Sequence, residues 1–297
     1  MMDKNDEGRR SHYLTLQFAI PDAPAADELV VVIGAATGGR PHHRIGDRYQ
    51  DLEELGEPLV LIHGVGMQAE AWYPQIEFFS KHYRVISVDM PGHGQSTQLT
   101  NDAPLQAFVD WTIEFICQLN VGAVNLAGHS MGSLITTGVS ATRPDLVKRM
   151  AVLNGVYKRT EKAKDAVLQR AEALKTGKID IDTPLQRWFG DSEVERQAAL
   201  KVKTWLQNVN MAGYATAYSA FAQGDSTYAD DWSKITCPAL ILTGTGDPNS
   251  TAEMAVQMAQ QAQNAKAIVI ENERHMVNLT APDKVNNAMQ AWLETSV

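Results

Sequence analysis

Short apolar runs alternate with more polar, helix-like segments along most of this chain. The runs lie at 58–62, 83–89, 121–126, 150–154, 239–243 and 267–271. Most of them are rich in β-branched residues and show little polar alternation, which is typical of strands that helices cover on both faces. Residues 108–119, between two of these runs, have the periodicity of an amphipathic helix. This alternation predicts an α/β fold with a doubly wound, mostly parallel sheet.

One long segment breaks the alternation. Between residues 154 and 239 there is no clear strand pattern, and the helix-like stretches are 161–175, 193–207 and 212–222. A segment of this length is too long to be a simple loop of a compact domain. We therefore predict that residues 157–232 form a helical cap over the C-terminal edge of the sheet, and that residues 56–156 and 233–297 form the core.

The first 55 residues carry a mixed signal. Residues 1–11 are polar, residues 13–18 alternate like a strand, and residues 29–33 form a second apolar run. Proline and glycine turn signals separate and follow these two runs. We expect residues 1–55 to form a tail and two leading strands, and the sequence leaves the role of this region open.

The stretch 124–132, VNLAGHSMG, joins an apolar run to the pattern G-x-S-x-G, and a helix-like segment follows. A strand that runs directly into a helix needs a tight turn, and glycines allow the backbones to approach closely. Such a turn exposes the serine hydroxyl at the edge of the sheet. The pattern and its context predict that Ser130 is a nucleophile.

A serine nucleophile needs a general base, and the base needs an orienting carboxylate. His275 is the only histidine after Ser130, and it follows the apolar run 267–271. Asp247 follows the run 239–243 in a loop of glycine and proline, where an ordinary turn aspartate is the alternative interpretation. The position after the preceding strand, where some hydrolases carry the acid, is Asn154, which cannot be an anion. We therefore expect Asp247 and His275 to complete a catalytic triad.

The oxyanion that forms when a serine attacks a carbonyl needs preplaced hydrogen-bond donors. The backbone N–H of Met131, directly after the nucleophile, is one candidate. The second is the N–H of Val65, in the loop His63-Gly64-Val65-Gly66 that follows the strand 58–62. We predict that Val65 and Met131 form the oxyanion hole.

No cofactor or metal signature accompanies these residues. The glycine-rich loop 63–66 is not followed by Lys-Ser/Thr, and no G-x-G-x-x-G is present, so nucleotide binding is not expected. His42 and His43 are adjacent rather than four residues apart, which disfavours a metal pair. We expect neither a cofactor nor a metal.

Together, these motifs resemble those of the α/β-hydrolase superfamily. They are His63-Gly64, the sequence DMPGHGQS at 89–96, GHSMG at 128–132, Asp247 and His275. The order nucleophile, acid, base is the order of that fold. From about Gly56 to the C-terminus, the chain is similar to the group that holds carboxylesterases, 3-oxoadipate enol-lactonases, perhydrolases and C–C bond hydrolases. The resemblance implies a cofactor-free serine hydrolase.

Hydrolysis of a carboxylic ester or lactone through an acyl-enzyme is our leading hypothesis for the reaction. Two alternatives stay open: C–C bond hydrolysis of a ring-cleavage product, and a ligand receptor with slow turnover on the same fold. Many C–C hydrolases have Asn before the serine and Gly-Gly after it, where this chain has His129 and Gly132-Ser133. Five aromatic residues are candidates for lining the substrate pocket, although ordinary packing explains each of them equally well: Trp72, Trp188, Trp205, Tyr214 and Phe221.

Composition narrows the range of partners. The formal net charge of −9 argues against nucleic acid and anionic membrane surfaces as partners. The two cysteines, Cys117 and Cys237, fit free thiols in a reducing compartment. Neither a secretory-signal pattern nor an apolar run long enough to span a bilayer is present. We expect a cytoplasmic protein that acts on a small molecule, and the sequence leaves open whether it forms a homo-oligomer.

Overall fold

The structure is a computed structural model, and it describes residues 13–16, 31–34, 56–177 and 179–297. Of the leading strands predicted at 13–18 and 29–33, the described parts are strands at Tyr13–Leu16 and Val31–Gly34. The predicted polar tail and the turns around these strands lie outside the described residues.

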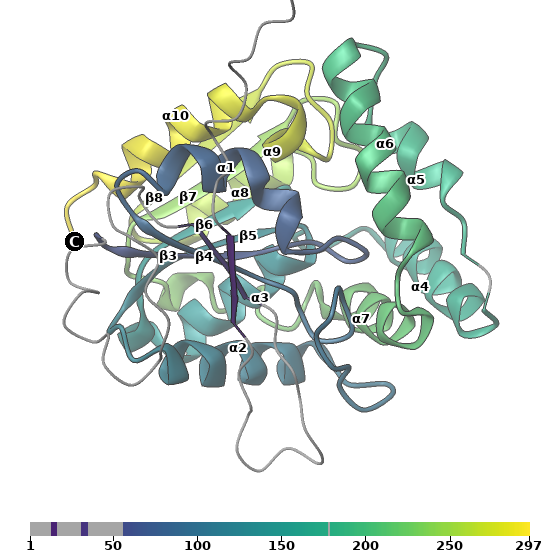
Figure 1. Cartoon of the computed structure of the whole chain (residues 1–297), viewed down its shortest axis with the longest axis horizontal. Helices are drawn as coiled ribbons and strands as arrows, with labels where there is room; N and C mark the ends of the chain where they lie inside the picture. Colours follow the sequence, from purple (N-terminus) through teal and green to yellow (C-terminus); the bar gives the residue numbers. More distant parts are fainter. Residues whose placement is uncertain (1–12, 17–30, 35–55, 178) are drawn as a thin grey trace, which may run out of the picture.

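An eight-stranded sheet forms the centre of the described chain, in the order β1-β2-β4-β3-β5-β6-β7-β8 (Figure 1). The strands are β1 (Tyr13–Leu16), β2 (Val31–Gly34), β3 (Pro58–Ile62), β4 (Arg84–Val88), β5 (Val124–His129), β6 (Val147–Leu153), β7 (Ala239–Gly244) and β8 (Ala265–Ile270). From β4 to β8 every neighbouring pair is parallel, whereas β1 pairs with β2 and β2 with β4 in antiparallel fashion. The sheet is therefore mostly parallel, as predicted.

Helices cover both faces of this sheet (Figure 1). They are α1 (Tyr73–Phe79), α2 (Leu105–Leu119), α3 (Met131–Thr142), α4 (Glu161–Lys175), α5 (Asp182–Trp188), α6 (Glu193–Gln207), α7 (Met211–Gly224), α8 (Ala252–Gln261), α9 (Val277–Thr280) and α10 (Pro282–Leu293). Figure 1 shows α1 and α10 above the sheet and α2 and α3 below it. This is the doubly wound arrangement that the alternation of apolar runs predicts.

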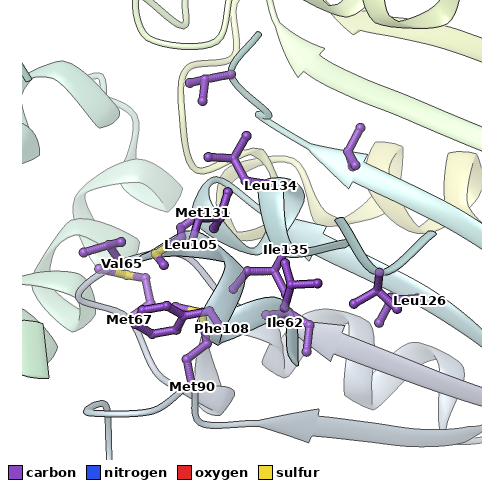
Figure 2. Packing of buried hydrophobic residues seen from close by; sticks show 14 of the residues in the cluster. Ile62, Val65, Met67, Met90, Leu105, Phe108, Leu126, Met131, Leu134 and Ile135 are labelled. Atoms are coloured by element: carbon purple, nitrogen blue, oxygen red, sulfur yellow. The ribbon is translucent and has the colours of Figure 1, made fainter. Parts of the chain in front are cut away.

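The strand β3 is apolar along its length because it is buried on both faces of the sheet. Leu59 and Leu61 point into the core under α1 and α10, whereas Val60 and Ile62 belong to the core on the side of α2 and α3. Successive side chains of a strand face opposite sides of the sheet, so both parities must be apolar here. Figure 2 shows part of the core on the side of α2 and α3, where Ile62 packs with Phe108 and Ile135.

The observed strand β6 begins at Val147, earlier than the predicted run 150–154, and the charged residues Lys148 and Arg149 hide this start from the apolar pattern. Arg149 is buried in the strand, and its guanidinium donates to the Glu57 carboxylate at 2.9 Å and to Asn125 Oδ1 at 3.0 Å. A buried charge needs such partners. The apolar pattern alone therefore misplaces the start of this strand.

The segment between β6 and β7 carries α4, α5, α6 and α7, and no strand lies there among the described residues. Figure 1 shows these helices gathered at one side of the molecule, beyond the sheet. The helix α5 is an addition to the pattern predicted from the sequence. The division of the chain into a core and a cap at 157–232 stays a prediction. No helix in the described ranges combines the length and apolarity needed to cross a membrane.

Candidate active site

The turn between β5 and α3 holds Ser130 in an unusual backbone conformation, with φ 54° and ψ −114°. A residue other than glycine is strained there, and such strain persists only where the surroundings enforce it. A Cβ on Gly128 would lie 2.0 Å from the carbonyl oxygen of Gly132, and a Cβ on Gly132 would lie 2.2 Å from that of Ile62. Both positions therefore require glycine, which explains the spacing of G-x-S-x-G.

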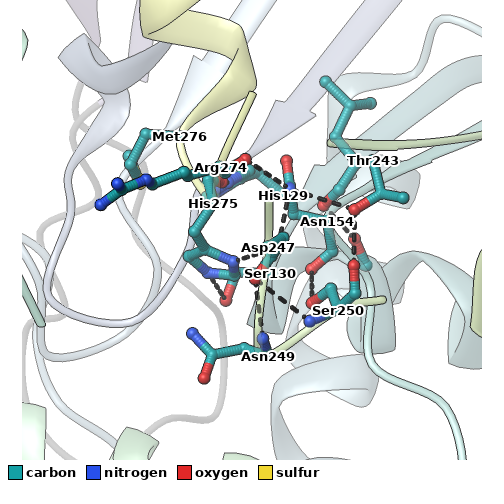
Figure 3. Close-up of polar contacts among 12 residues, drawn as sticks. His129, Ser130, Asn154, Thr243, Asp247, Asn249, Ser250, Arg274, His275 and Met276 are labelled. Carbon is teal, nitrogen blue, oxygen red and sulfur yellow. Dashed lines mark hydrogen bonds and ion pairs between the residues drawn. The ribbon is translucent and has the colours of Figure 1, made fainter. Parts of the chain in front are cut away.

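The structure brings the side chains of Ser130, His275 and Asp247 into one chain of contacts (Figure 3). His275 Nε2 lies 3.1 Å from Ser130 Oγ, and His275 Nδ1 lies 2.7 Å from Asp247 Oδ2. All three residues are buried. An ionised carboxylate only accepts hydrogen bonds, so Nδ1 carries the imidazole proton and the lone pair of Nε2 faces the serine hydroxyl. This arrangement can activate a serine for nucleophilic attack.

Three neighbours stabilise the charge on Asp247. Asn154 Nδ2 donates to Asp247 Oδ2 at 2.8 Å, and the backbone N–H groups of Asn249 and Ser250 donate to Oδ1 at 2.8 and 3.2 Å. Burial raises the pKa of Asp247, but His275, Asn249 and Asn154 together bring it below its usual value. Asp247 is therefore an anion at neutral pH, as an orienting carboxylate must be.

The candidate oxyanion donors lie on two segments next to Ser130. Met131 is the first residue of α3, so its N–H has no intrahelical acceptor. Val65 lies in the loop after β3 and its N–H donates no hydrogen bond within the described residues. The same loop passes so close to the nucleophile that a Cβ on Gly64 would lie 3.0 Å from Ser130 Cβ. The oxyanion hole of Val65 and Met131 stays a prediction.

Two buried histidines brace this loop. The N–H of Met90 donates to His63 Nε2 at 2.9 Å, and the N–H of Gly66 donates to His93 Nε2 at 2.9 Å. Burial lowers the pKa of His63 well below its usual value and lowers that of His93 to about 4. Both imidazoles are therefore neutral at pH 7 and can accept these hydrogen bonds.

His129, directly before Ser130, contacts the backbone of His275. Its Nε2 lies 2.8 Å from the carbonyl oxygen of His275. Burial, followed by the influence of His275, lowers the pKa of His129 to about 3. His129 is therefore neutral across the physiological range and donates from Nε2 to this carbonyl.

A cavity of about 480 Å³ lies beside Ser130 and His275, which line it together with residues of α4, α5 and α7. Of the five aromatic pocket candidates, Trp188, Tyr214 and Phe221 line this cavity. The ring of Trp188 lies 5.5 Å from that of His275, measured between centroids.

The other two pocket candidates lie in the cores instead. Trp72 is fully buried with Ile76 and Phe79 under α1, and Trp205 packs beside Val202. Neither lines the cavity. Residue type made both plausible, but the direction of their side chains is decided by packing.

Sequence reasoning does not single out three arginines that line the cavity: Arg159, Arg170 and Arg187. Charged residues in and beside α4 and α5 resemble those of any solvated surface, so no signal in the pattern distinguishes them. Within the described ranges, no three His, Cys, Asp or Glu side chains gather as metal ligands would.

Comparison with known proteins agrees with the fold and the motifs. The model of a family described as "Alpha/beta hydrolase family" matches residues 59–288, and the chain belongs to this family. A second model, described as "Amino acid synthesis", matches only residues 1–46, which is too little of the chain to assign a family.

Among its relatives is the (E)-2-((N-methylformamido)methylene)succinate hydrolase of Acinetobacter baylyi (strain ATCC 33305 / BD413 / ADP1), which is 78% identical over 81% of this chain and 92% of its own length. The 3-oxoadipate enol-lactonase 1 of the same strain is 29% identical over 78% of this chain and 86% of its own length. Among solved structures, the enol-lactonase from Burkholderia xenovorans LB400 has a TM-score of 0.76 at 22% identity, over 91% of this chain and 97% of that one. The protein is a hydrolase of the group that its motifs resemble.

Proposed function

We propose that this protein is a cofactor-free serine hydrolase that cleaves an acyl bond in a small dicarboxylate, with (E)-2-((N-methylformamido)methylene)succinate as the first candidate substrate. The observation that carries the proposal is the contact chain from Ser130 through His275 to Asp247 beside a cavity. The relative that is 78% identical supports the choice of substrate.

The first half of the proposed reaction forms an acyl-enzyme. His275 Nε2 takes the hydroxyl proton while Ser130 Oγ bonds to the carbonyl carbon, and the N–H groups of Val65 and Met131 hold the oxyanion. The tetrahedral intermediate then collapses, the bond to the leaving atom breaks, and His275 gives its proton to that atom. Asp247 keeps the imidazole oriented and stabilises its positive charge.

Water completes the cycle. His275 takes a proton from a water molecule whose oxygen bonds to the acyl carbon. The bond from that carbon to Ser130 Oγ breaks, and the serine regains its proton. The net reaction adds one water across the cleaved bond, so it needs no further reactant.

The formyl carbon is the atom that Ser130 attacks in the candidate substrate. The two carboxylates are anions and repel a nucleophile, whereas the N-formyl group is a neutral carbonyl. The nitrogen that leaves is conjugated through the C=C bond with a carboxylate, which spreads its electron pair and makes it a better leaving group than an ordinary amine. The products of this step are formate and a methylaminomethylene succinate.

Lactone hydrolysis is the second candidate, because an enol-lactonase is 29% identical to this chain. A lactone or ester presents the same kind of acyl carbon to Ser130. The C–C bond hydrolase and the slow-turnover receptor remain alternatives from the sequence, and the same three residues would serve the first of them. The net charge of −9 supports a small molecule, rather than nucleic acid or an anionic membrane surface, as the partner.

The test compares the candidate substrate with p-nitrophenyl acetate, an enol-lactone and a dienone acid, using the wild type, Ser130→Ala and the matched exposed control Ser226→Ala. We expect the highest kcat/KM for the formamido substrate, with release of formate. Ser130→Ala should lower the rate by roughly a thousandfold or more, and Ser226→Ala should not change it. Wild-type activity in Ser130→Ala would contradict the assignment of Ser130 as the nucleophile. If the candidate substrate were consumed without release of formate, cleavage of the N-formyl bond would be contradicted.

A further inference from the structure

The wall of the cavity beside Ser130 is rich in positive charge. Arg159, Lys162, Arg170 and Arg187 line the cavity, whereas Asp180 is the acidic residue among its described lining. This excess of cations is unusual in a chain whose formal net charge is −9. A concentration of positive charge in an enclosed site favours an anionic ligand.

Arg159 is held by several contacts, but one nitrogen of its guanidinium has no hydrogen-bond partner among the described residues. Its side chain is only 3% exposed, and Nη1 lies 3.2 Å from Asp225 Oδ1 and donates to the Phe221 carbonyl at 3.3 Å. The guanidinium also lies over the Phe221 ring, 4.3 Å from its centroid. Nη2, although buried, has no hydrogen-bond partner among the described residues. A buried donor without an acceptor is unfavourable, so this atom points to a missing acceptor.

Arg170, on α4, repeats this feature. Its Nε is buried and has no hydrogen-bond partner in the described part of the chain. The hydroxyl of Tyr218, on α7, is under the influence of the same guanidinium groups. Burial raises the pKa of Tyr218, while Arg170, Arg159 and Arg187 act to lower it. Arg159, Arg170 and Tyr218 all line the cavity, so two buried nitrogens without a partner and a phenol belong to residues of its wall.

We propose that Arg159 and Arg170 form a carboxylate-binding subsite, which holds one carboxylate of a dicarboxylate substrate while the acyl carbon lies at Ser130. Guanidinium groups bind carboxylates by charge-assisted hydrogen bonds, often in pairs. Asp225 already neutralises much of the charge on Arg159, so the subsite suits a carboxylate rather than a more highly charged anion. This inference rests on the proposed function for the position of the acyl carbon.

Binding of succinate, which cannot be hydrolysed, tests the subsite independently of turnover. The dissociation constants of succinate and of its uncharged dimethyl ester are measured by calorimetry on the wild type. The same measurements are made on Arg170→Gln and on Arg159→Lys, which keeps a positive charge opposite Asp225 but loses the forked guanidinium. Arg196→Gln is the matched control, because Arg196 is exposed on α6 and pairs with Glu193 outside the cavity. Melting temperatures report whether each variant is folded.

We expect the wild type to prefer succinate over the diester, and Arg170→Gln to weaken succinate binding by about tenfold or more. Arg159→Lys should also reduce this preference, and Arg196→Gln should leave it unchanged. The inference is overturned if folded Arg170→Gln binds succinate as tightly as the wild type, or if the wild type shows no preference for the dicarboxylate. Because succinate is bound but not cleaved, this test of the subsite holds even if the proposed hydrolase activity is contradicted.

Discussion

Arg274 donates a hydrogen bond from Nη1 to the carbonyl oxygen of Gln186 at 3.0 Å, and so joins the loop that carries His275 to the end of α5. The same nitrogen donates to the carbonyl of Phe189. These carbonyls belong to the last turn of α5 and the residues after it, where a cation is favoured. The helix carries Trp188, whose ring lies against His275. Arg274, next to His275, therefore holds a helix that lines the cavity beside Ser130.

Replacing Arg274 should loosen this part of the cavity. We expect Arg274→Gln to raise KM about three- to tenfold with a smaller loss in kcat, because two charge-assisted hydrogen bonds to the end of α5 are lost. Steady-state kinetics on the candidate substrate measure both constants. Arg274→Lys keeps the charge and one donor nitrogen, so its KM should lie between those of the wild type and Arg274→Gln. A wild-type KM in Arg274→Gln would show that α5 is held by other contacts.

Asn154 provides a second test, because its amide donates to Asp247 Oδ2 at 2.8 Å. Asn154→Asp places two carboxylates at this distance, and they cannot both ionise easily. The pair then takes up a proton at a higher pH than Asp247 alone, whose pKa in the wild type is lower than usual. The acid limb of the pH–rate profile should therefore move upward, and activity near neutral pH should fall.

Asn154→Ala is the control for this change. It removes the amide donor without adding a charge, so its profile should move less than that of Asn154→Asp. An unchanged acid limb in Asn154→Asp would contradict the view that Asp247 must stay ionised for activity.

The sequence was sufficient to predict the residues of the site that a motif or the order along the chain singles out. Ser130 lies in a turn that only glycine neighbours permit, and His275 is the only downstream histidine. The structure brings these two together with Asp247 in a chain of short contacts. These residues could be selected because the motif, the strand ends and the order along the chain all restrict the choice.

The cavity wall could not be predicted in the same way. Trp72 and Trp188 are both tryptophans, yet Trp72 is fully buried under α1 and Trp188 lies beside His275. Which of them lines the cavity depends on how α5 packs on the core, a contact between segments far apart in sequence. The same is true of Arg159, whose partner Asp225 is 66 residues away along the chain. Local pattern carries no information on such pairs.

Asp89 should make the stability of the protein depend on pH. Burial raises its pKa from 3.8 to about 6, although the N–H groups of Ala69 and Gln95 act in the opposite direction. The folded state thus binds this proton more tightly than the unfolded state, so the contribution of Asp89 to stability grows as the pH falls from about 7 to about 4. Ionisation at higher pH lowers the free energy of unfolding by up to about 3 kcal/mol.

Asp89→Asn removes this titration but keeps an oxygen acceptor for Ala69. Urea unfolding of both proteins between pH 4 and pH 8 isolates the effect, because other groups cancel in the difference. Relative to the wild type, Asp89→Asn should gain stability as the pH rises, by as much as about 3 kcal/mol over this range. A difference that does not change with pH would contradict a raised pKa.

The central claim is that Ser130 is a nucleophile activated by His275. The rate of covalent labelling by a fluorophosphonate, with the modified residue identified by peptide mass spectrometry, tests it most directly. We predict that the label is found on Ser130 in the wild type, is absent in Ser130→Ala, and forms at least about a hundredfold more slowly in His275→Gln, because the general base is lost. An unlabelled Ser130 in the folded wild type, or equal labelling rates with and without His275, would contradict the account.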